Sequence, residues 1–262
     1  MRYLSGFSPS ETLILLNHQD VKLSDLLKVT FMDLLLKKVL TSVEISKQYD
    51  KRYVAIKNKY IVRGQHFFSY FGKEYENVFL APFIKSNDIK ILFRHIAKMG
   101  YQNSRSQARY KSLISKSAKL SGLTFKSQMQ KLFGGFSINE KGIELKTLIS
   151  KEIAALETEL PDLMATDKER AFRILKEIGG NVFLLKNIDF ELLHNFDKDL
   201  MTEMKREREG QDIGSSSCSG YDWASFNSDY SSFESGNSGD AGDSGCSGCS
   251  GSGCSGCGGG GD

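Results

Sequence analysis

Residues 24–45 read SDLLKVTFMDLLLKKVLTSVEI, and within this stretch the spacing of the apolar side chains changes. In its first part they are dense and recur every three to four residues, which is typical of one or two buried helices. In its last part Val43 and Ile45 alternate with polar residues, and Val54 and Ile56 do so after a polar segment. Alternation is typical of strands, so we predict a β-hairpin directly after the helical stretch.

A helix start lies upstream of this stretch. Ser8 has the chemistry of an N-cap, Pro9 suits the first helical position, and Glu11 completes a capping box, so a short helix is predicted there. Helix, one or two helices, and hairpin within about 60 residues is the element order of a winged-helix module. We therefore expect residues 1–63 to form a winged-helix-like module.

The next part of the chain, residues 64–210, is expected to be an α-helical domain, which makes the fold mainly α with a small hairpin content. Its clearest helix has apolar residues at spacings of three and four over 145–160, and Pro161 is expected to end or kink it. Residues 137–142 (SINEKG) resemble the junction between a wing and a helix, so a second winged-helix-like unit is expected in this domain.

Two further helices are predicted before the composition changes. Thr166 begins a capping box that opens a helix ending at Gly179 and Gly180. A last amphipathic helix is predicted over 193–204.

The composition changes sharply near Gly210. Residues 211–262 contain seven acids, no Lys or Arg, all five cysteines, 14 of the 25 glycines and 15 serines, whereas all 35 cations precede them. So little apolar surface cannot offset the entropy of ordering, and we expect an acidic, disordered Gly/Ser/Cys-rich tail. Its aromatic residues gather in 221–233, the one part expected to dock on the body or on a partner.

Four tail cysteines form two CxxC pairs, Cys246 with Cys249 and Cys254 with Cys257. Four thiolates are the ligand set of a zinc site or an iron–sulfur cluster. The spacer between the pairs contains only serine and glycine, which supplies no apolar shell around a metal. Metal binding, covalent modification or a redox or tethering role of the thiols, and a solvated low-complexity tail therefore remain open, and no other cofactor is expected.

A basic segment spans residues 98–131, with eight cations, interleaved aromatic residues and no acid. Cations with aromatic residues suit phosphate contacts and base stacking. The candidate nucleic-acid-binding residues are Arg105, Arg109, Lys111, Lys116 and Lys119, on a helix expected over 104–120. The alternatives are a solvated helix face, an anionic membrane surface, or a face that pairs with the acidic tail.

A winged helix that reads DNA presents polar or basic side chains near the start of its recognition helix. The candidate helix, residues 30–38, has Asp33 near that end and its two lysines at the other end. The acid would repel phosphate, which favours a module that binds protein over one that reads bases.

No recognised catalytic motif occurs in the sequence. The four histidines are scattered, no Gly-Lys-Ser/Thr or GxSxG is present, and the glycine pattern GxGxxG at 251–256 lies in the tail, with no strand pattern before it. No signal-peptide pattern opens the chain, and no apolar run approaches the ~20 residues of a membrane helix. We expect a cytoplasmic protein without a transmembrane segment, with reduced cysteines.

An α-rich body that contains SINEKG at 137–142 and GGNVFLL at 179–185, followed by the Gly/Cys-rich end at 244–262, resembles uncharacterised bacterial proteins of that organisation. The resemblance implies a bacterial source and brings no activity with it. The first hypothesis is a non-enzymatic interaction or adaptor protein with an unidentified protein partner and a thiol-presenting tail. The alternatives are a non-specific nucleic-acid-binding protein that uses residues 98–131, and a carrier for a metal-binding or modified tail.

Overall fold

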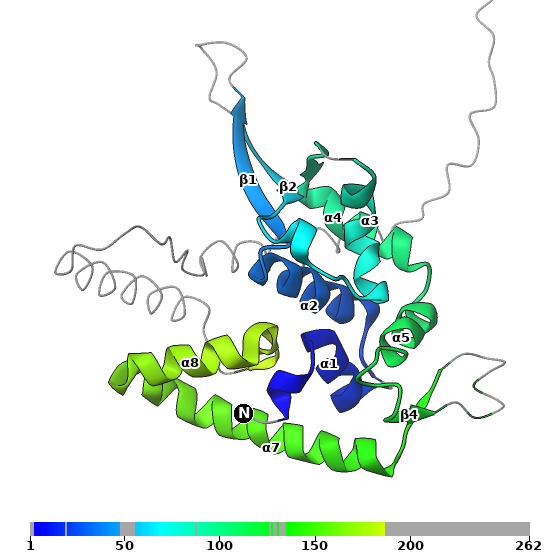
Figure 1. The fold of residues 1–262 in the computed structure, drawn as a ribbon, viewed down its shortest axis with the longest axis vertical. Helices are drawn as coiled ribbons and strands as arrows, with labels where there is room; N and C mark the ends of the chain where they lie inside the picture. The colour runs from blue at the N-terminus through cyan, green and yellow to red at the C-terminus, as the bar shows by residue number, and fades with distance from the viewer. Residues whose placement is uncertain are drawn as a thin grey trace, which may run out of the picture.

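The computed structural model describes residues 3–18, 20–47, 56–86, 88–125, 127, 130 and 135–186. This part of the chain is mostly helical and contains two small antiparallel sheets (Figure 1). In chain order its elements are η1 (Leu4–Gly6), α1 (Pro9–Asn17), α2 (Leu23–Leu36), β1 (Leu40–Lys47), β2 (Ile56–Arg63), η2 (Phe67–Ser69), η3 (Glu74–Glu76), α3 (Asn77–Lys85), β3 (Ile91–Leu92), α4 (Phe93–Ser104), α5 (Gln107–Ser115), β4 (Thr124–Phe125), β5 (Ser137–Ile138), α7 (Glu140–Thr166), α8 (Lys168–Ile178) and η4 (Gly179–Leu184).

Helix α2 lies at the centre of the helical body (Figure 1). It is one continuous helix, and every residue from Leu26 to Leu36 is buried. It contacts α1, α4, α5 and η4. One cluster of buried apolar residues extends from Leu4 to Leu185, so residues from both predicted domains pack in a single core.

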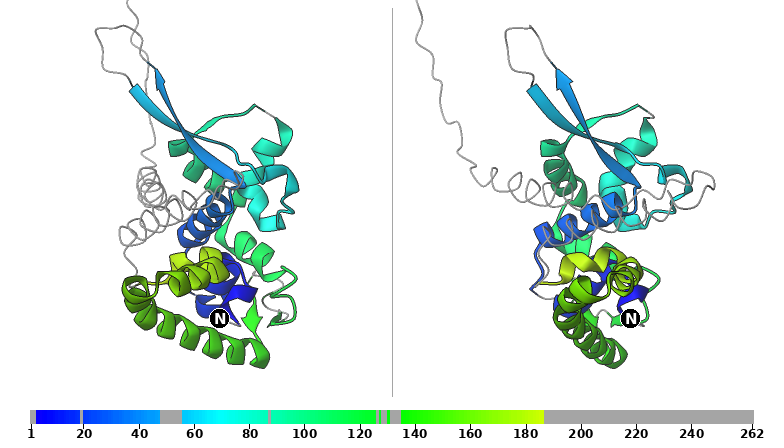
Figure 2. Two further views of the ribbon diagram at one scale, coloured as in Figure 1. Left: turned by 60° about the vertical axis from the view of Figure 1, so that its left-hand side comes forward. Right: turned by 90° about the vertical axis from the view of Figure 1, so that its left-hand side faces the viewer.

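The predicted start of α1 and the predicted hairpin are both confirmed. The capping box of Ser8 and Glu11 is formed, with Pro9 in the first turn. Strands β1 and β2 are antiparallel, with Leu40 opposite Arg63. The short strand β3 pairs with the other edge of β2. The hairpin projects away from the helices (Figures 1 and 2), and residues 48–55 between its strands lie outside the described part.

Two details of the later helices differ from the expectation. Of the two alternatives for Pro161, that it ends the long helix is wrong: α7 continues to Thr166, because Leu160 and Met164 are buried on either side of the proline and hold the chain in the helix. The cap of α8 is Asp167 and not Thr166, since the Asp167 carboxylate accepts the N–H of Arg170. The helix predicted over 193–204 and the tail lie outside the described residues.

The end of α2 is a turn that glycine usually makes. The N–H of Lys38 donates to the carbonyl of Leu35 and the N–H of Val39 donates to that of Leu34, which is the hydrogen-bond pattern of a Schellman motif. Lys38 occupies its left-handed position with φ 52°. A Cβ atom is strained in that conformation, so lysine is a costly residue here.

Replacing Lys38 with glycine is expected to raise the free energy of unfolding by about 1 kcal/mol, because the left-handed backbone is then unstrained. Urea unfolding with an unchanged slope measures it. Lys116→Gly is the matched control, since that lysine also follows a helix but has φ −85°. Equal destabilisation by both substitutions would contradict the strain at position 38.

Candidate functional site

The loop after β2 exposes large aromatic side chains. We name residues 66–71 the aromatic loop: Phe68 is 82% exposed and Phe71 is 94% exposed. The Arg63 guanidinium lies 4.7 Å from the ring centroid of Phe67 and 5.0 Å from that of Phe68. Exposed phenylalanines in a loop that also contacts an arginine are typical of protein interfaces, where aromatic residues and arginine are enriched.

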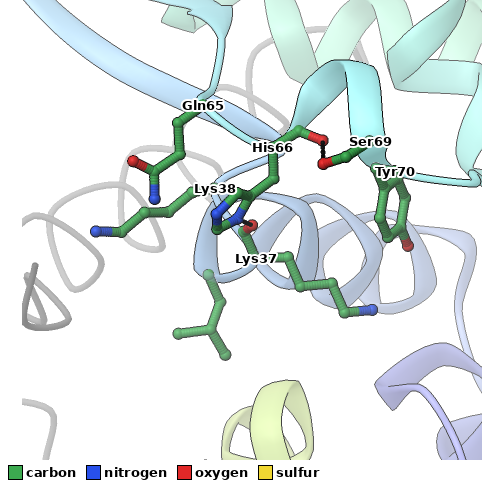
Figure 3. A pocket seen from close by; sticks show the side chains of 7 residues that line it. Lys37, Lys38, Gln65, His66, Ser69 and Tyr70 are labelled. Atoms are coloured by element: carbon green, nitrogen blue, oxygen red, sulfur yellow. Dashed lines mark hydrogen bonds between the residues drawn. The ribbon is translucent and has the colours of Figure 1, made fainter. Parts of the chain in front are cut away.

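A cavity of about 460 Å³ opens beside this loop (Figure 3). The Nδ1–H of His66 donates to the carbonyl oxygen of Lys37 over 2.9 Å, which fixes the imidazole against the end of α2. The side chains of Lys38 and Gln65 lie on the same side of the imidazole in Figure 3. The cavity is lined by Leu36, Lys37, Lys38, Gln65, His66, Ser69 and Tyr70.

These cavity residues, together with Phe68 and Phe71, are named the aromatic–basic surface. It contains two lysines, a histidine and no acid, so its charge favours anionic groups. Two exposed rings beside a cationic cavity match a ligand that carries both carboxylates and apolar groups.

Beneath this surface three carboxylates are buried: Glu11, Asp33 and Glu76. The ammonium of Lys37 lies 2.5 Å from Asp33 Oδ2, and that of Lys73 lies 2.9 Å from Glu11 Oε2. Two of the three buried carboxylates, those of Asp33 and Glu11, are therefore each paired with a lysine ammonium group.

The third acid, Glu76, is held by hydrogen bonds instead of an ammonium. The Tyr70 hydroxyl lies 3.0 Å from both of its carboxylate oxygens, and the backbone N–H of Lys73 donates to Oε2 over 2.7 Å. Tyr70 thus joins the cavity wall to the buried acids, and this network fixes the aromatic loop on the body.

The pKa values of the three acids diverge for physical reasons. Burial raises the pKa of Asp33 above its ordinary value, in spite of Lys37. Burial also raises the pKa of Glu76, in spite of the Lys73 N–H. Burial works in the same direction on Glu11, but the Ser8 N–H and the Lys73 ammonium outweigh it and the pKa of Glu11 is lowered.

Replacing Glu76 with glutamine is expected to stabilise the fold relative to the native chain as the pH rises. An acid whose pKa is raised on folding binds more protons in the folded than in the unfolded state, so its stability contribution falls as pH increases through and above the ordinary carboxyl range. Glutamine does not ionise, so this loss of stability at higher pH disappears. Its side-chain amide can still accept a hydrogen bond from the Lys73 backbone N–H and form one with the Tyr70 hydroxyl.

Urea unfolding of this variant between pH 4 and 8 would test the expectation, with Glu74→Gln as the exposed control on the same turn. A stability difference that does not change with pH would show that folding leaves the pKa of Glu76 unchanged, which would contradict the raised pKa.

The candidate nucleic-acid residues do not share one face. The predicted helix is shorter than expected, because Arg105 has φ 64° and precedes α5. Arg109 lies on the exposed side of α5, and the exposed Lys116 and Lys119 follow the helix. Lys111 is on the inner side, where its ammonium donates to the His18 carbonyl over 3.0 Å.

A second cavity, of about 330 Å³, lies beside α5 and is lined in part by Lys73, Lys116 and Lys119. Its wall also contains Glu11, so its charge is mixed. Among the described residues around α5, the basic segment therefore provides the exposed cations Arg105, Arg109, Lys116 and Lys119, while Lys111 points inward.

The structure places Asp33 differently from the expectation that this acid would repel phosphate. Asp33 does not face solvent, where it would repel phosphate, but is buried and paired with Lys37. The start of the candidate recognition segment, residues 30–36, is buried as well, so its packing in the core, and not an exposed acid, keeps it from a groove.

The predicted metal ligands Cys246, Cys249, Cys254 and Cys257 lie outside the described residues. Among the residues that are described, no group of three or more His, Cys, Asp or Glu side chains could hold a metal ion. Over the same ranges, no helix combines the length and apolar character needed to cross a bilayer.

The aromatic–basic surface was not predicted as a site. Its sequence signal is the run HFFSYF at 66–71, which is strongly aromatic and follows neither helical nor strand spacing. Without such spacing, a helix or strand cannot turn all of these aromatic side chains toward the core, so some of them are expected to be exposed. The contribution of Lys37 and Lys38 could not be inferred, because the turn at Lys38 brings them beside residues almost 30 positions later.

Comparisons of this chain with protein-family models, with curated proteins and with solved structures found no match.

Proposed function

We propose that this chain is a non-enzymatic interaction protein, and that the aromatic–basic surface binds a protein segment with acidic and aromatic side chains. The observation that carries the proposal is the exposure of Phe68 and Phe71 beside a cationic cavity. In water, such rings lose apolar hydration when a partner covers them. The lysines favour a partner with carboxylates.

The proposal includes the interpretation of residues 1–63 as a winged-helix-like module in a cytoplasmic protein. The order α1, α2, β1, β2 supports it. In this interpretation the end of α2 and the loop after the hairpin provide the binding surface, and the buried face of α2 holds the module to the rest of the body.

Photo-crosslinking in the full chain tests the proposal. Benzoylphenylalanine in place of Phe68 is expected to form covalent adducts in the producing cells, with another protein or with a remote segment of the same chain. The same residue in place of Ile143, which is exposed on α7, is the control. Combined Lys38→Asp and Gln65→Glu substitutions reverse the charge of the surface without touching the buried acids, and are expected to reduce the adducts at position 68.

Equal adduct yields at positions 68 and 143 would reject the aromatic–basic surface as the binding site. Adduct yields at position 68 that do not change when Lys38→Asp and Gln65→Glu reverse the charge would reject it as well. Aspartate is chosen at position 38 because it tolerates the left-handed backbone better than most residues do.

A second candidate function is non-specific binding of nucleic acid, favoured by the exposed cations Arg109, Lys116 and Lys119 around α5. Replacing all three with glutamine is expected to weaken binding of a labelled oligonucleotide by the full chain at least about tenfold at low salt, and to reduce its salt dependence. Lys111→Gln is the matched control, because this lysine faces inward. Binding that is salt-insensitive, or equally weakened by the control, would end this alternative.

The tail provides the third candidate, a carrier of metal or of a covalent modification, which rests on the two CxxC pairs alone. Intact mass of the protein from its own cells tests it under native and denaturing conditions. A mass increment that disappears on denaturation, and with Cys246→Ser and Cys249→Ser, would indicate zinc or an iron–sulfur cluster. A mass equal to that of the sequence in both conditions would remove the carrier function.

A further inference from the structure

We infer that the aromatic–basic surface is bound by residues 221–234 of the same chain, so that the protein covers its own interaction site. The inference rests on the proposed function and names the occupant of that site. The segment reads YDWASFNSDYSSFE and contains five aromatic residues, three acids and no cation. It is the one part of residues 211–262 in which aromatic residues occur.

The charges of the two partners are complementary. The aromatic–basic surface contains Lys37, Lys38 and His66 and no acid, whereas the segment contains Asp222, Asp229 and Glu234 and no base. Lys37 already pairs with the buried Asp33, so Lys38 is the cation best placed to receive a carboxylate from outside. Docking therefore neutralises charge on both partners at once.

The apolar groups decide between this surface and the cations around α5. Tail aromatics gain most where they cover exposed rings, and Phe68 and Phe71 are 82% and 94% exposed. The cavity beside α5 offers Leu113, which is already half-buried, and contains two acids, Glu11 and Glu74. An acidic aromatic segment is thus matched better by the aromatic–basic surface.

The chain between the described body and residues 221–234 is long enough for the segment to reach the aromatic–basic surface. The last described element, η4, packs against α2, and a Cβ atom at Gly180 would lie only 2.3 Å from Oδ1 of Asp33. Asp33 is one helical turn before Lys37. Residues 187–220 join this point to the segment, and a chain of that length reaches about 50 Å even in its most compact regular form, the α-helix. The segment is therefore an intramolecular partner, whose effective concentration is on the order of millimolar when the connection spans the two sites, so weak contacts suffice.

The single tryptophan of the chain, Trp223, lies inside the proposed segment and reports on docking without a label. In the full chain we expect its emission to be blue-shifted, and its quenching by acrylamide weaker, than in a synthetic peptide of residues 219–236. Phe68→Ser with Phe71→Ser, and separately Lys38→Asp with Gln65→Glu, are expected to bring both signals to those of the peptide.

Two further variants keep the test decisive. Asp222→Asn, Asp229→Asn and Glu234→Gln alter only the tail and are expected to release Trp223 in the same way, so a folding defect of the body cannot imitate the result. Lys116→Glu with Lys119→Glu is the matched control on α5 and is expected to leave Trp223 unchanged. Release by this control, and not by the changes at Lys38 and Gln65, would move the tail to α5 and overturn the inference.

The inference and the proposed function fail in distinguishable ways. Peptide-like emission in the unaltered chain, together with charge-sensitive adducts to another protein at position 68, would overturn self-occupation and retain the interaction site. Peptide-like emission without adducts above the Ile143 control would overturn both. A crosslink from position 68 to residues 219–236 of the same chain, with shielded Trp223, is the result expected if both hold.

Discussion

Replacing Asn181 with leucine is expected to lower the free energy of unfolding by about 4 kcal/mol. The Asn181 amide nitrogen donates to the carbonyls of Leu4, Phe7 and Ile178 over 3.0, 2.8 and 3.2 Å. Its oxygen accepts the Thr12 hydroxyl over 2.8 Å.

This one side chain therefore joins η1, α1 and the end of α8, and it is buried. Leucine has a similar volume but leaves these partners without their hydrogen bonds in the core, at about 1–3 kcal/mol for each group that stays unpaired. Chemical denaturation of the full chain measures the loss.

Asn103→Leu is the matched control, because its amide donates to one carbonyl, that of Val78, and the side chain is exposed. We expect it to cost less than about 1 kcal/mol. Thr12→Val should cost less in the Asn181→Leu background than alone, since both remove the same bond. A loss below about 1 kcal/mol for Asn181→Leu would mean that water replaces the amide and that the three segments are joined by apolar packing alone.

The local features of the fold were readable from the sequence because each has a local cause. The capping box at Ser8 and Glu11 joins residues three apart, and the strands of the hairpin follow from the alternation of Val43 and Ile45. The helical spacing before them placed α2, though it left one or two helices open. Residues that satisfy one another within a turn or a strand leave a periodic signal.

What could not be predicted depends on contacts between distant residues. Asn181 lies in a stretch, GGNVFLL, that reads as helix punctuation, yet its partner Thr12 is 169 positions away. A charged residue such as Asp33 is expected on the exposed side of a helix. It is buried in the structure because Gly180 of η4 packs against its carboxylate and Lys37 pairs with it. The same holds for the aromatic–basic surface, in which the left-handed turn at Lys38 brings the end of α2 beside His66.

Replacing Gly64 with alanine is expected to cost about 3 kcal/mol and to open the cavity as well. A Cβ atom at this position would lie 2.0 Å from the carbonyl oxygen of Lys38 and 2.9 Å from the Thr41 hydroxyl, far inside contact distance. Two hydrogen bonds hold this junction: the Gly64 N–H donates to Val39 over 2.8 Å, and the His66 N–H donates to Lys38 over 3.1 Å. Relieving the clash must lengthen these bonds, which adds their loss to the cost of overpacking.

Because the clash is with main-chain atoms, no change of side chain at position 38 relieves it. The stabilisation from Lys38→Gly and the loss from Gly64→Ala should therefore both persist in the double variant, which urea unfolding measures. Gly122→Ala is the control, since nothing lies within 4 Å of its added Cβ atom. Separation of the junction also moves His66 away from Lys37, so Trp223 should become more accessible to acrylamide even though Phe68 and Phe71 are intact. Full stability with unchanged quenching would show that the junction accommodates the added Cβ atom without losing its two hydrogen bonds, and would contradict the close contact of Gly64 with Lys38 as the feature that holds the cavity together.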